Sequence, residues 1–497
     1  MRMQPQPGAC RQNAAGMRRG PRPRAFAAGA LAVLLAGCAS LSPPVPVTTA
    51  PVAATYPDDA LPGVDADAPL AASVAWRDYF TDPQLRALIE QALRHNRDLR
   101  LATLRVAEAR AGYRIRRADQ WPGVGLDAQG ARSRAPGDLS PTGRPLVSGD
   151  YEVGLGLSWE LDLWGRVRSL KAAALETYFA TEAAREAATV NLIAAVADGY
   201  VGLRALDERL RLAQQTIATR QETYRIFKRR VEVGATSKLE LTQVQTLLNQ
   251  AQALRTELER ERAAQAHALA LLVGAPVDLD ALAPLPADAD AWLPALRPGL
   301  PSDLLLDRPD ILAAEYQLRA ANADIGAARA AFFPRVALTG ALGSASAQLD
   351  GLFDSGSRAW SFVPTISLPI FSGGRLRANL DLATVRRDAA VAEYERAIQA
   401  AFRDVADALS ARRWLAEQVR ILQETVDAQA ERARLAGLRY DNGAAAFLEV
   451  LDAQRDLLTA QQQLAQARGA LLSSHILLYA ALGGGPLPED AAAAPSP

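Results

Sequence analysis

The chain has 497 residues, and its 55 Lys and Arg residues are balanced by 55 Asp and Glu residues. A chain without net charge or a basic stripe lacks the electrostatic footprint of nucleic-acid binding, so we expect no nucleic-acid partner. A hydrophobic content of 49% with only 6% aromatic residues excludes a mainly disordered chain and favours long helices.

The first segment of the chain is typical of a lipoprotein signal. Arginines between Arg18 and Arg24 precede an apolar stretch over residues 25–36, which ends in the sequence LAGC at Cys38. This stretch is shorter than the roughly 20 apolar residues that a membrane-spanning helix needs. We therefore expect cleavage before Cys38, with a diacylglycerol on its thiol and an acyl chain on its new amine. Ala39, in place of an Asp, favours sorting to the outer membrane.

Few residues of the expected mature chain could carry chemistry. The other cysteine, Cys10, lies before the cleavage point, and only three histidines are present. The sequence also lacks the HExxH, GxSxG and phosphate-loop motifs. We expect no catalytic residue, no metal and no cofactor apart from the covalent lipid on Cys38, and therefore no enzyme activity.

The remainder of the chain matches itself at an offset of roughly 210 residues, which indicates a duplicated half-molecule rather than a short solenoid repeat. Trp121 and Pro122 correspond to Phe333 and Pro334, and the sequence VGATSKLEL corresponds to NGAAAFLEV. The predicted organisation is a signal peptide at 1–37, an acylated N-terminal segment at 38–80, a first repeat at 81–275, a connector at 276–307, a second repeat at 308–483 and a disordered tail at 484–497.

Each repeat contains a hairpin pattern, at about 123–162 and about 335–370, in which apolar residues alternate with small or polar ones. Such strands are typical of a membrane barrel with a wet lumen, although a half-buried soluble sheet would show the same alternation. Four strands cannot close a barrel, since about eight is the smallest fillable number. Because open edges are not tolerated in lipid, other copies must complete the wall, as a dimer or a trimer. Pro364 is expected to disturb the last strand.

The helical segments are unusually long. No proline interrupts residues 375–440, where apolar residues recur with spacings of three and four from Val391 to Val426, and a matching helix is predicted over 166–233. Each helix would be roughly 100 Å long, which exceeds the thickness of an outer membrane. Before the second repeat, Asp307 is expected to cap the helix that begins at Pro309.

Two long segments, residues 76–93 and 299–340, closely resemble the TolC-like outer membrane factors, in the NodT-type lipoprotein branch that accompanies resistance-nodulation-division pumps. The resemblance implies an α+β membrane protein: a homotrimer with a twelve-stranded β-barrel in the outer membrane, continued by a long α-helical barrel in the periplasm. It implies an equatorial collar of connectors and two partners, a periplasmic adaptor (membrane fusion protein) and an inner-membrane resistance-nodulation-division transporter.

The resemblance also implies functional residues at the two helix-to-helix turns. Gly234 and Gly443 would lie at the periplasmic tips that contact the adaptor. The aperture gate would comprise Glu449, Asp452, Tyr440 and Glu240. The spacing of Glu449 and Asp452 places both carboxylates on one helical face. Ala445 departs from the family pattern, in which well-known members have an arginine, so the latch is expected to differ.

The function predicted is an outer-membrane channel subunit of a tripartite efflux system, a passive exit duct for small molecules. Two alternatives stay open: the duct of a protein-secretion pump, and a structural coiled-coil lipoprotein. The second would explain the heptads and Cys38 but leaves the four strands and the duplication unexplained.

Overall fold

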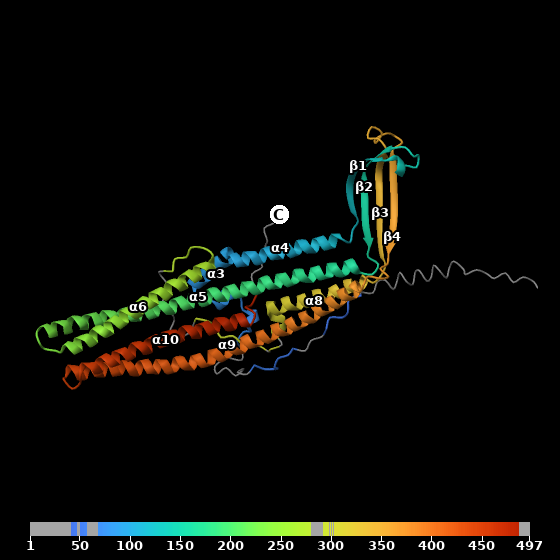
Figure 1. The fold of residues 1–497 in the computed structure, drawn as a ribbon. Helices are drawn as coiled ribbons and strands as arrows, with labels where there is room; N and C mark the ends of the chain where they lie inside the picture. Colours follow the sequence, from blue (N-terminus) through green and yellow to red (C-terminus); the bar gives the residue numbers. More distant parts are fainter. Residues whose placement is uncertain are drawn as a thin grey trace, which may run out of the picture. The chain divides into compact units, whose positions relative to one another are not determined.

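The computed structural model describes residues 41–46, 50–56, 68–279, 292–297, 299, 301 and 303–486. The predicted signal peptide and Cys38 therefore lie outside the described residues. The chain divides into two compact units, each built from both repeats. One unit contains Gln120–Ser169 and Ile325–Arg377 and holds the sheet, and the other contains most of the helices (Figure 1).

The sheet has four antiparallel strands in the order β1-β2-β3-β4. They are β1 (Gly123–Ala135), β2 (Leu146–Leu161), β3 (Arg335–Ser346) and β4 (Arg358–Ser367). The expected disturbance at Pro364 is wrong, because Pro364 pairs with Leu338 in an unbroken register. Within one chain β4 is an edge strand of the sheet, where a missing N–H can face away from β3 without interrupting the β3–β4 pairing.

The strand register gives the sheet two different faces. One face carries rows of apolar side chains, such as Leu126, Leu155, Leu342 and Trp360, which lie directly opposite one another across all four strands. The other face carries glycine, alanine, serine and acidic residues. On that face Gly154 lies opposite Gly343, and a Cβ added to Gly343 would lie 2.4 Å from the Cα of Gly154. Two facing glycines therefore let β2 and β3 approach more closely than side chains would allow.

The helices confirm the long periodic segments. The longer ones are α3 (Pro83–His95), α4 (Arg97–Ala118), α5 (Arg166–Glu232), α6 (Lys238–Val273), α8 (Pro309–Ala330), α9 (Arg375–Asp441) and α10 (Phe447–Ala481). The short ones are η1 (Ala71–Ser73), α2 (Trp76–Tyr79), η2 (Gly137–Leu139) and α7 (Leu304–Asp307). Both α5 and α9 have 67 residues, or about 100 Å. Among the described helices, none has the length and apolar character to cross a membrane.

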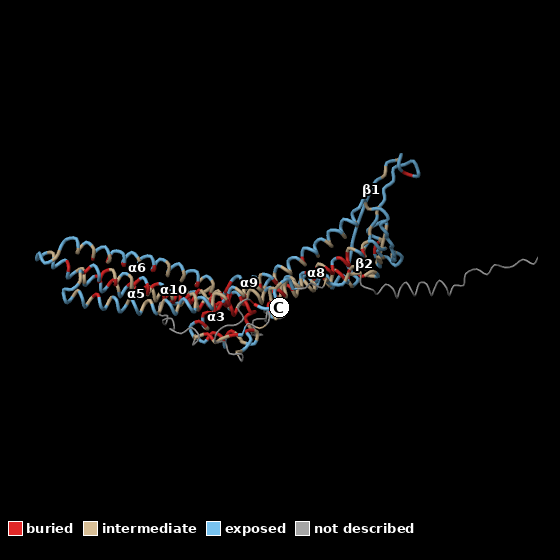
Figure 2. Tube along the Cα trace, turned by 90° about the horizontal axis from the view of Figure 1, so that it is seen from below, coloured by how far each residue is buried: buried red, intermediate tan, exposed pale blue. Residues whose placement is uncertain are grey.

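The main core of the helical unit forms where α3 meets the long helices, and Figure 2 shows buried positions gathered there. The rings of Tyr79 and Tyr479 stack at 4.4 Å. Nearby, the N-cap residue of α3, Asp82, forms a buried ion pair with Arg204 of α5, with 2.8 Å between Oδ2 and Nη1. The hydroxyl of Tyr200 donates to the same carboxylate oxygen at 2.9 Å. This network fixes the start of α3 to the middle of α5.

Two equivalent residues, Asn96 and Arg308, each join the start of one helix of a repeat to the end of its last helix by a hydrogen bond. In the first repeat, Nδ2 of Asn96 donates to the carbonyl oxygen of Leu272 at 2.8 Å, which joins the start of α4 to the end of α6. In the second repeat, Nη1 of Arg308 donates to the carbonyl oxygen of Ala481 at 3.0 Å, which joins the start of α8 to the end of α10. The duplication therefore preserves a joint between the ends of two helices, although its side chain has changed from an amide to a guanidinium.

Two predictions near this second joint are wrong. Asp307 ends α7 and Arg308 precedes α8, while the carboxylate that accepts the N–H of Ile311 is that of Asp310. The predicted disordered tail wrongly includes residues 484–486, which pack against the helical unit, while its other residues, 487–497, lie outside the described part of the chain. The hydroxyl of Tyr479 donates to the carbonyl of Gly484, because the left-handed glycines that follow α10 fold the chain back against the core.

Candidate functional site

The two helix-to-helix turns have the same backbone construction. Gly234 follows α5 with a φ of 72°, and Gly443 follows α9 with a φ of 71°. The N–H of the next residue, Ala235 or Ala444, donates to a carbonyl five residues earlier at 2.8 Å in each turn. This is the helix-ending motif that requires a left-handed residue, so glycine is selected here by its backbone conformation. Space is not the reason, because a Cβ at either glycine would meet no atom within 4 Å.

The carboxylate of Glu240 is hydrogen-bonded within the first turn of its own helix, α6. Its carboxylate accepts from the backbone N–H of Ser237 at 3.3 Å, while the hydroxyl of Ser237 accepts from the N–H of Glu240 at 3.2 Å. Thr236 also donates to the carboxylate, and these hydrogen bonds lower the pKa of Glu240. In this chain the predicted gate residue therefore forms a capping box at the start of α6, with no bond to the α9–α10 hairpin.

Tyr440 does connect the two hairpins. Its hydroxyl accepts from Nη1 of Arg230 at 2.6 Å, which joins α9 to the end of α5. Its ring lies 4.9 Å from that of Phe447, and Phe447 lies 4.3 Å from Phe227. The guanidinium of Arg230 covers the ring of Phe227 at 5.4 Å. The sequence prediction named Tyr440 and missed the other three residues. The available signal was an aromatic residue close to each turn: Phe227 lies seven residues before Gly234, and Phe447 lies four residues after Gly443.

The carboxylates of Glu449 and Asp452 both form ion pairs. Oε2 of Glu449 lies 2.9 Å from Nη1 of Arg439, and Oδ1 of Asp452 lies 3.2 Å from Nη1 of Arg455. One turn farther along α10, Asp456 pairs with Arg432 of α9 at 2.7 Å, and hydrogen bonds from Arg432 and then Arg455 lower the pKa of Asp456. The three carboxylates near the tip are thus matched by three arginines.

All of these ion pairs are at least one-third exposed. Exposed pairs contribute about 0–1 kcal/mol, so they can exchange partners readily. Within one chain the acidic residues of the tip therefore belong to a weakly held, nearly neutral network. The spacing of Asp452 and Arg455, three residues apart on one helix, was the signal that could have suggested this pairing.

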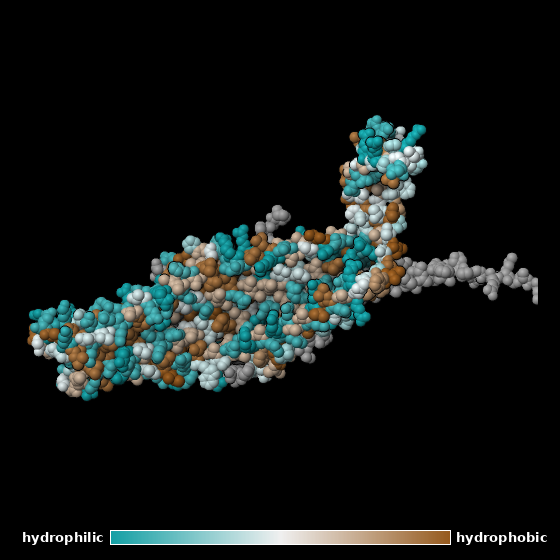
Figure 3. Space-filling view, viewed as in Figure 1, coloured by the Kyte–Doolittle hydropathy of each residue, from teal (hydrophilic) through white to brown (hydrophobic). Residues whose placement is uncertain are grey.

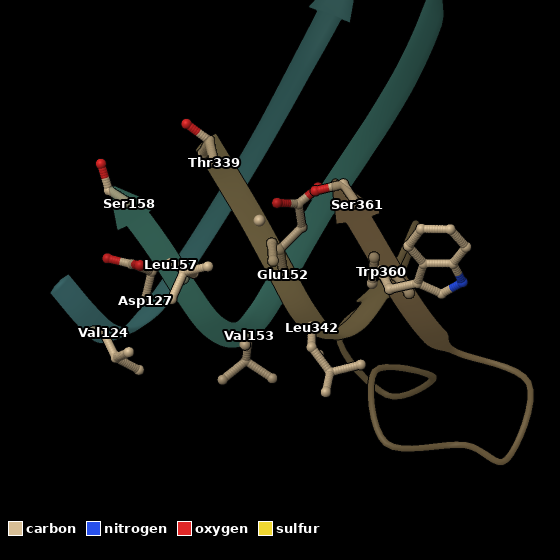
Figure 4. Close-up of a pocket in the computed structure, with 18 of the residues that line it drawn as sticks. Val124, Asp127, Glu152, Val153, Leu157, Ser158, Thr339, Leu342, Trp360 and Ser361 are labelled. Atoms are coloured by element: carbon tan, nitrogen blue, oxygen red, sulfur yellow. The ribbon is translucent and has the colours of Figure 1, made fainter. Parts of the chain in front are cut away.

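The second functional surface is the sheet. Figure 4 shows Val124, Val153 and Leu342 on one side of it, with Glu152, Thr339 and Ser361 on the other. A hollow of about 730 Å³ lies along these strands. In Figure 3 apolar residues lie along the strands and hydrophilic ones gather at the loop end. A sheet of this kind has one face suited to lipid and one suited to water.

Comparison with known proteins identifies this architecture. The family model for the outer membrane efflux protein matches residues 88–275 and 300–484. The chain belongs to the outer membrane efflux protein family. It is 46% identical over 458 residues to the solvent efflux pump outer membrane protein SrpC of Pseudomonas putida, which covers 91% of this chain and 97% of the relative. It is 43% identical to the outer membrane protein OprJ of Pseudomonas aeruginosa, over 93% of this chain and 97% of that one.

Solved structures agree with this assignment. The open state of the Neisseria gonorrhoeae MtrE outer membrane channel matches with a TM-score of 0.82 at 40% identity, over 90% of this chain and 98% of that one. The Campylobacter jejuni CmeC outer membrane channel matches with a TM-score of 0.83 at 28% identity, over 90% and 95%. The predicted fold class is confirmed: this efflux protein is a duplicated α+β channel subunit of the outer membrane that extends into the periplasm.

Proposed function

We propose that this outer membrane efflux protein is the passive exit duct of a tripartite pump, and that three copies enclose its channel. The observation that carries the proposal is the four-stranded sheet with two free edges, β1 and β4, and two chemically different faces. Free strand edges cannot remain in lipid, so the edges of neighbouring copies must pair. Two copies would supply eight strands and three would supply twelve; the family resemblance favours three.

The cargo is proposed to be small molecules, delivered by an inner-membrane resistance-nodulation-division transporter through a periplasmic adaptor. The names of the relatives support this, because they describe solvent, toluene and antibiotic efflux pumps. The rival function, protein secretion, would require the same duct with a different pump. Among the described residues of the tip, the side chains form an aromatic and ion-paired cluster, and no residue there is arranged for chemistry on a cargo.

The tips are proposed to carry the adaptor contact and the gate. Gly234 and Gly443 would let the two turns fit against the adaptor. The resting gate would be held by Tyr440 with Arg230 and by Glu449 and Asp452 with their arginines. Because these contacts are exposed and individually weak, an adaptor that offers other partners could release them at small cost.

The covalent lipid on Cys38 remains a proposal, supported by the LAGC sequence behind a basic and apolar segment. An intact-mass measurement of the purified mature protein should show cleavage before Cys38 and the added acyl chains. An unmodified Cys38 behind an uncleaved leader would contradict the anchor and leave the duct proposal untouched.

The duct is tested by two measurements on the full mature protein. Native mass spectrometry in detergent should give a trimer. Expression in cells that lack their own outer-membrane ducts, together with an adaptor and a transporter of the resistance-nodulation-division type, should restore resistance to pump substrates. A stable monomer with full β content would contradict the channel, and restored protein export without restored resistance would favour the secretion alternative.

A further inference from the structure

The two faces of the sheet differ in charge as well as in polarity. On the apolar face the only charged strand residues are Arg132, Arg134 and Arg358. All three are exposed, and none forms an ion pair or side-chain hydrogen bond with another described residue. The acids of the strands, among them Asp127 and Glu152, lie on the opposite face, where Figure 4 shows Glu152 pointing away from Val153 and Leu342.

The height of these arginines on the sheet matches the polar edge of a membrane. Along β4, Arg358 lies eight residues from Ile366, the last apolar residue of that face. At about 3.4 Å per residue and a tilt of about 40°, this is roughly 20 Å of depth, against an apolar band about 25 Å tall. Arg132 and Arg134 lie farther toward the loop end, beyond Tyr151. The long Arg358 side chain can extend to the head groups, and the other two lie among them.

All three arginines lie on edge strands of the sheet. Arg132 and Arg134 belong to the edge strand β1, and Arg358 belongs to the edge strand β4. Within one chain these strands are about 14 Å apart, which is three strand spacings. Pairing of β1 with β4 of the next copy would bring them to about 4.8 Å. The three arginines would then lie along one seam between copies. In the register of the sheet Arg358 is level with Ala128, so Arg132 and Arg134 lie four and six residues farther toward the loop end, about 14 and 20 Å along the strand.

We propose that each seam binds the phosphate groups of a phosphorylated glycolipid in the outer leaflet, through Arg132 and Arg134 of one copy and Arg358 of the next. This inference rests on the trimer of the proposed function. Guanidinium groups recognise phosphate with paired, charge-assisted hydrogen bonds, and no carboxylate of the same strand face competes for them. The apolar rows below, including Leu126 and Trp360, would hold the acyl chains. The bound lipid would bridge two copies and stabilise the seam.

The test uses the detergent-purified protein and bisphosphorylated lipid A, with dephosphorylated lipid A and inorganic phosphate as competing probes. Native mass spectrometry should show up to three lipid A molecules per trimer. The variant Arg132→Gln/Arg134→Gln/Arg358→Gln should bind at least about tenfold more weakly and lose the thermal stabilisation that the lipid confers. The control, Arg105→Gln/Arg114→Gln/Arg396→Gln, removes three exposed arginines of the helical unit that have no described ion pair, and should bind as the parent does.

Several outcomes would overturn the site. Equal lipid A binding by the two triple variants, or equal binding of the dephosphorylated lipid, would exclude phosphate recognition by these arginines. Competition by millimolar inorganic phosphate as strong as that of the lipid would indicate a free-anion site. An unchanged affinity in Arg358→Gln alone would place the site on β1 rather than at the seam. A parent protein that is not oligomeric would refute the proposed assembly, and lipid binding measured on that species would still report on β1 separately.

Discussion

Breaking the ion pair between Arg204 and Asp82 should strongly destabilise the helical unit, because it would leave one buried charge without its partner. Its side chains are only 3% and 9% exposed, and the Arg204 guanidinium lies over the rings of Tyr200 and Trp292 at 5.1 and 5.7 Å. Replacing Arg204 with Met keeps the apolar stem and removes the charge. The carboxylate of Asp82 would then be left buried with a hydroxyl and two backbone N–H groups as its only partners.

Removing one partner of a buried ion pair costs about 3–5 kcal/mol. The remaining hydrogen bonds to Asp82 place the expected loss at the lower end, about 3 kcal/mol for Arg204→Met. Asp82→Asn keeps an acceptor for the helix cap but removes the carboxylate charge beside the buried guanidinium, so it should also cost about 3 kcal/mol. Because the two residues share one interaction, the double variant should lose much less than the sum of the two single losses.

The measurement is urea unfolding of the detergent-solubilised protein, followed by the helical circular dichroism signal. Arg396→Met, at an exposed position of α9 with no described ion pair, is the control for the substitution itself. A loss below about 1 kcal/mol in Arg204→Met, or strict additivity in the double variant, would refute the assignment of this pair as a stabilising element.

Three further outcomes are expected. Gly443→Ala should lower the free energy of unfolding by about 1 kcal/mol, from the strain of its left-handed backbone alone. Gly274→Ala should lower it by about 3 kcal/mol, because the added Cβ would also lie 2.5 Å from a carbonyl oxygen. The midpoints of urea unfolding compare the two variants. Burial lowers the pKa of His475 to about 4, so the folded state keeps this imidazole neutral while the unfolded chain is protonated below about 6.5. The free energy of unfolding should therefore fall by up to about 3 kcal/mol between pH 6.5 and 4. In thermal melts at different pH values, His475→Gln should remove this loss. Neutralising Glu449 and Asp452 by Gln and Asn should make the channel anion-selective in planar bilayers, because the arginines would remain; unchanged reversal potentials would show that these residues do not face the pore.

The sequence was sufficient for the elements whose signals are local. The end of α9 was predicted at residue 440 and lies at Asp441, since an uninterrupted heptad pattern and a terminal glycine both act within a few residues. The strands were found by their alternation, but the effect of Pro364 was misjudged because edge position depends on sheet order, which no local pattern encodes.

The partners of the candidate site residues were much less predictable. Arg230 and Tyr440 are 210 residues apart in the chain, and only the packing of the two hairpins brings them together. The pairing of Glu449 with Arg439 likewise depends on how tightly the turn closes. The sequence placed Glu449 and Asp452 together on one helical face, whereas their partners come from two different helices: Arg439 from α9, across the turn, and Arg455 from α10 itself.

The two joints explain how a duplicated molecule can have unequal halves. In the first repeat the described side-chain bonds of Asn96 reach only α4 and α6. In the second, Arg308 makes a paired bond to Asp310 and also approaches Asp404 of α9 at 3.5 Å, so one buried guanidinium connects α8, α9 and α10. The α9 helix is thereby fixed at Asp404, which lies roughly 55 Å from the end of the helix at Asp441. A displacement of the α9–α10 turn must therefore be taken up by bending of the helix between these points, and the weak, exposed pairs near the tip offer the least resistance to it.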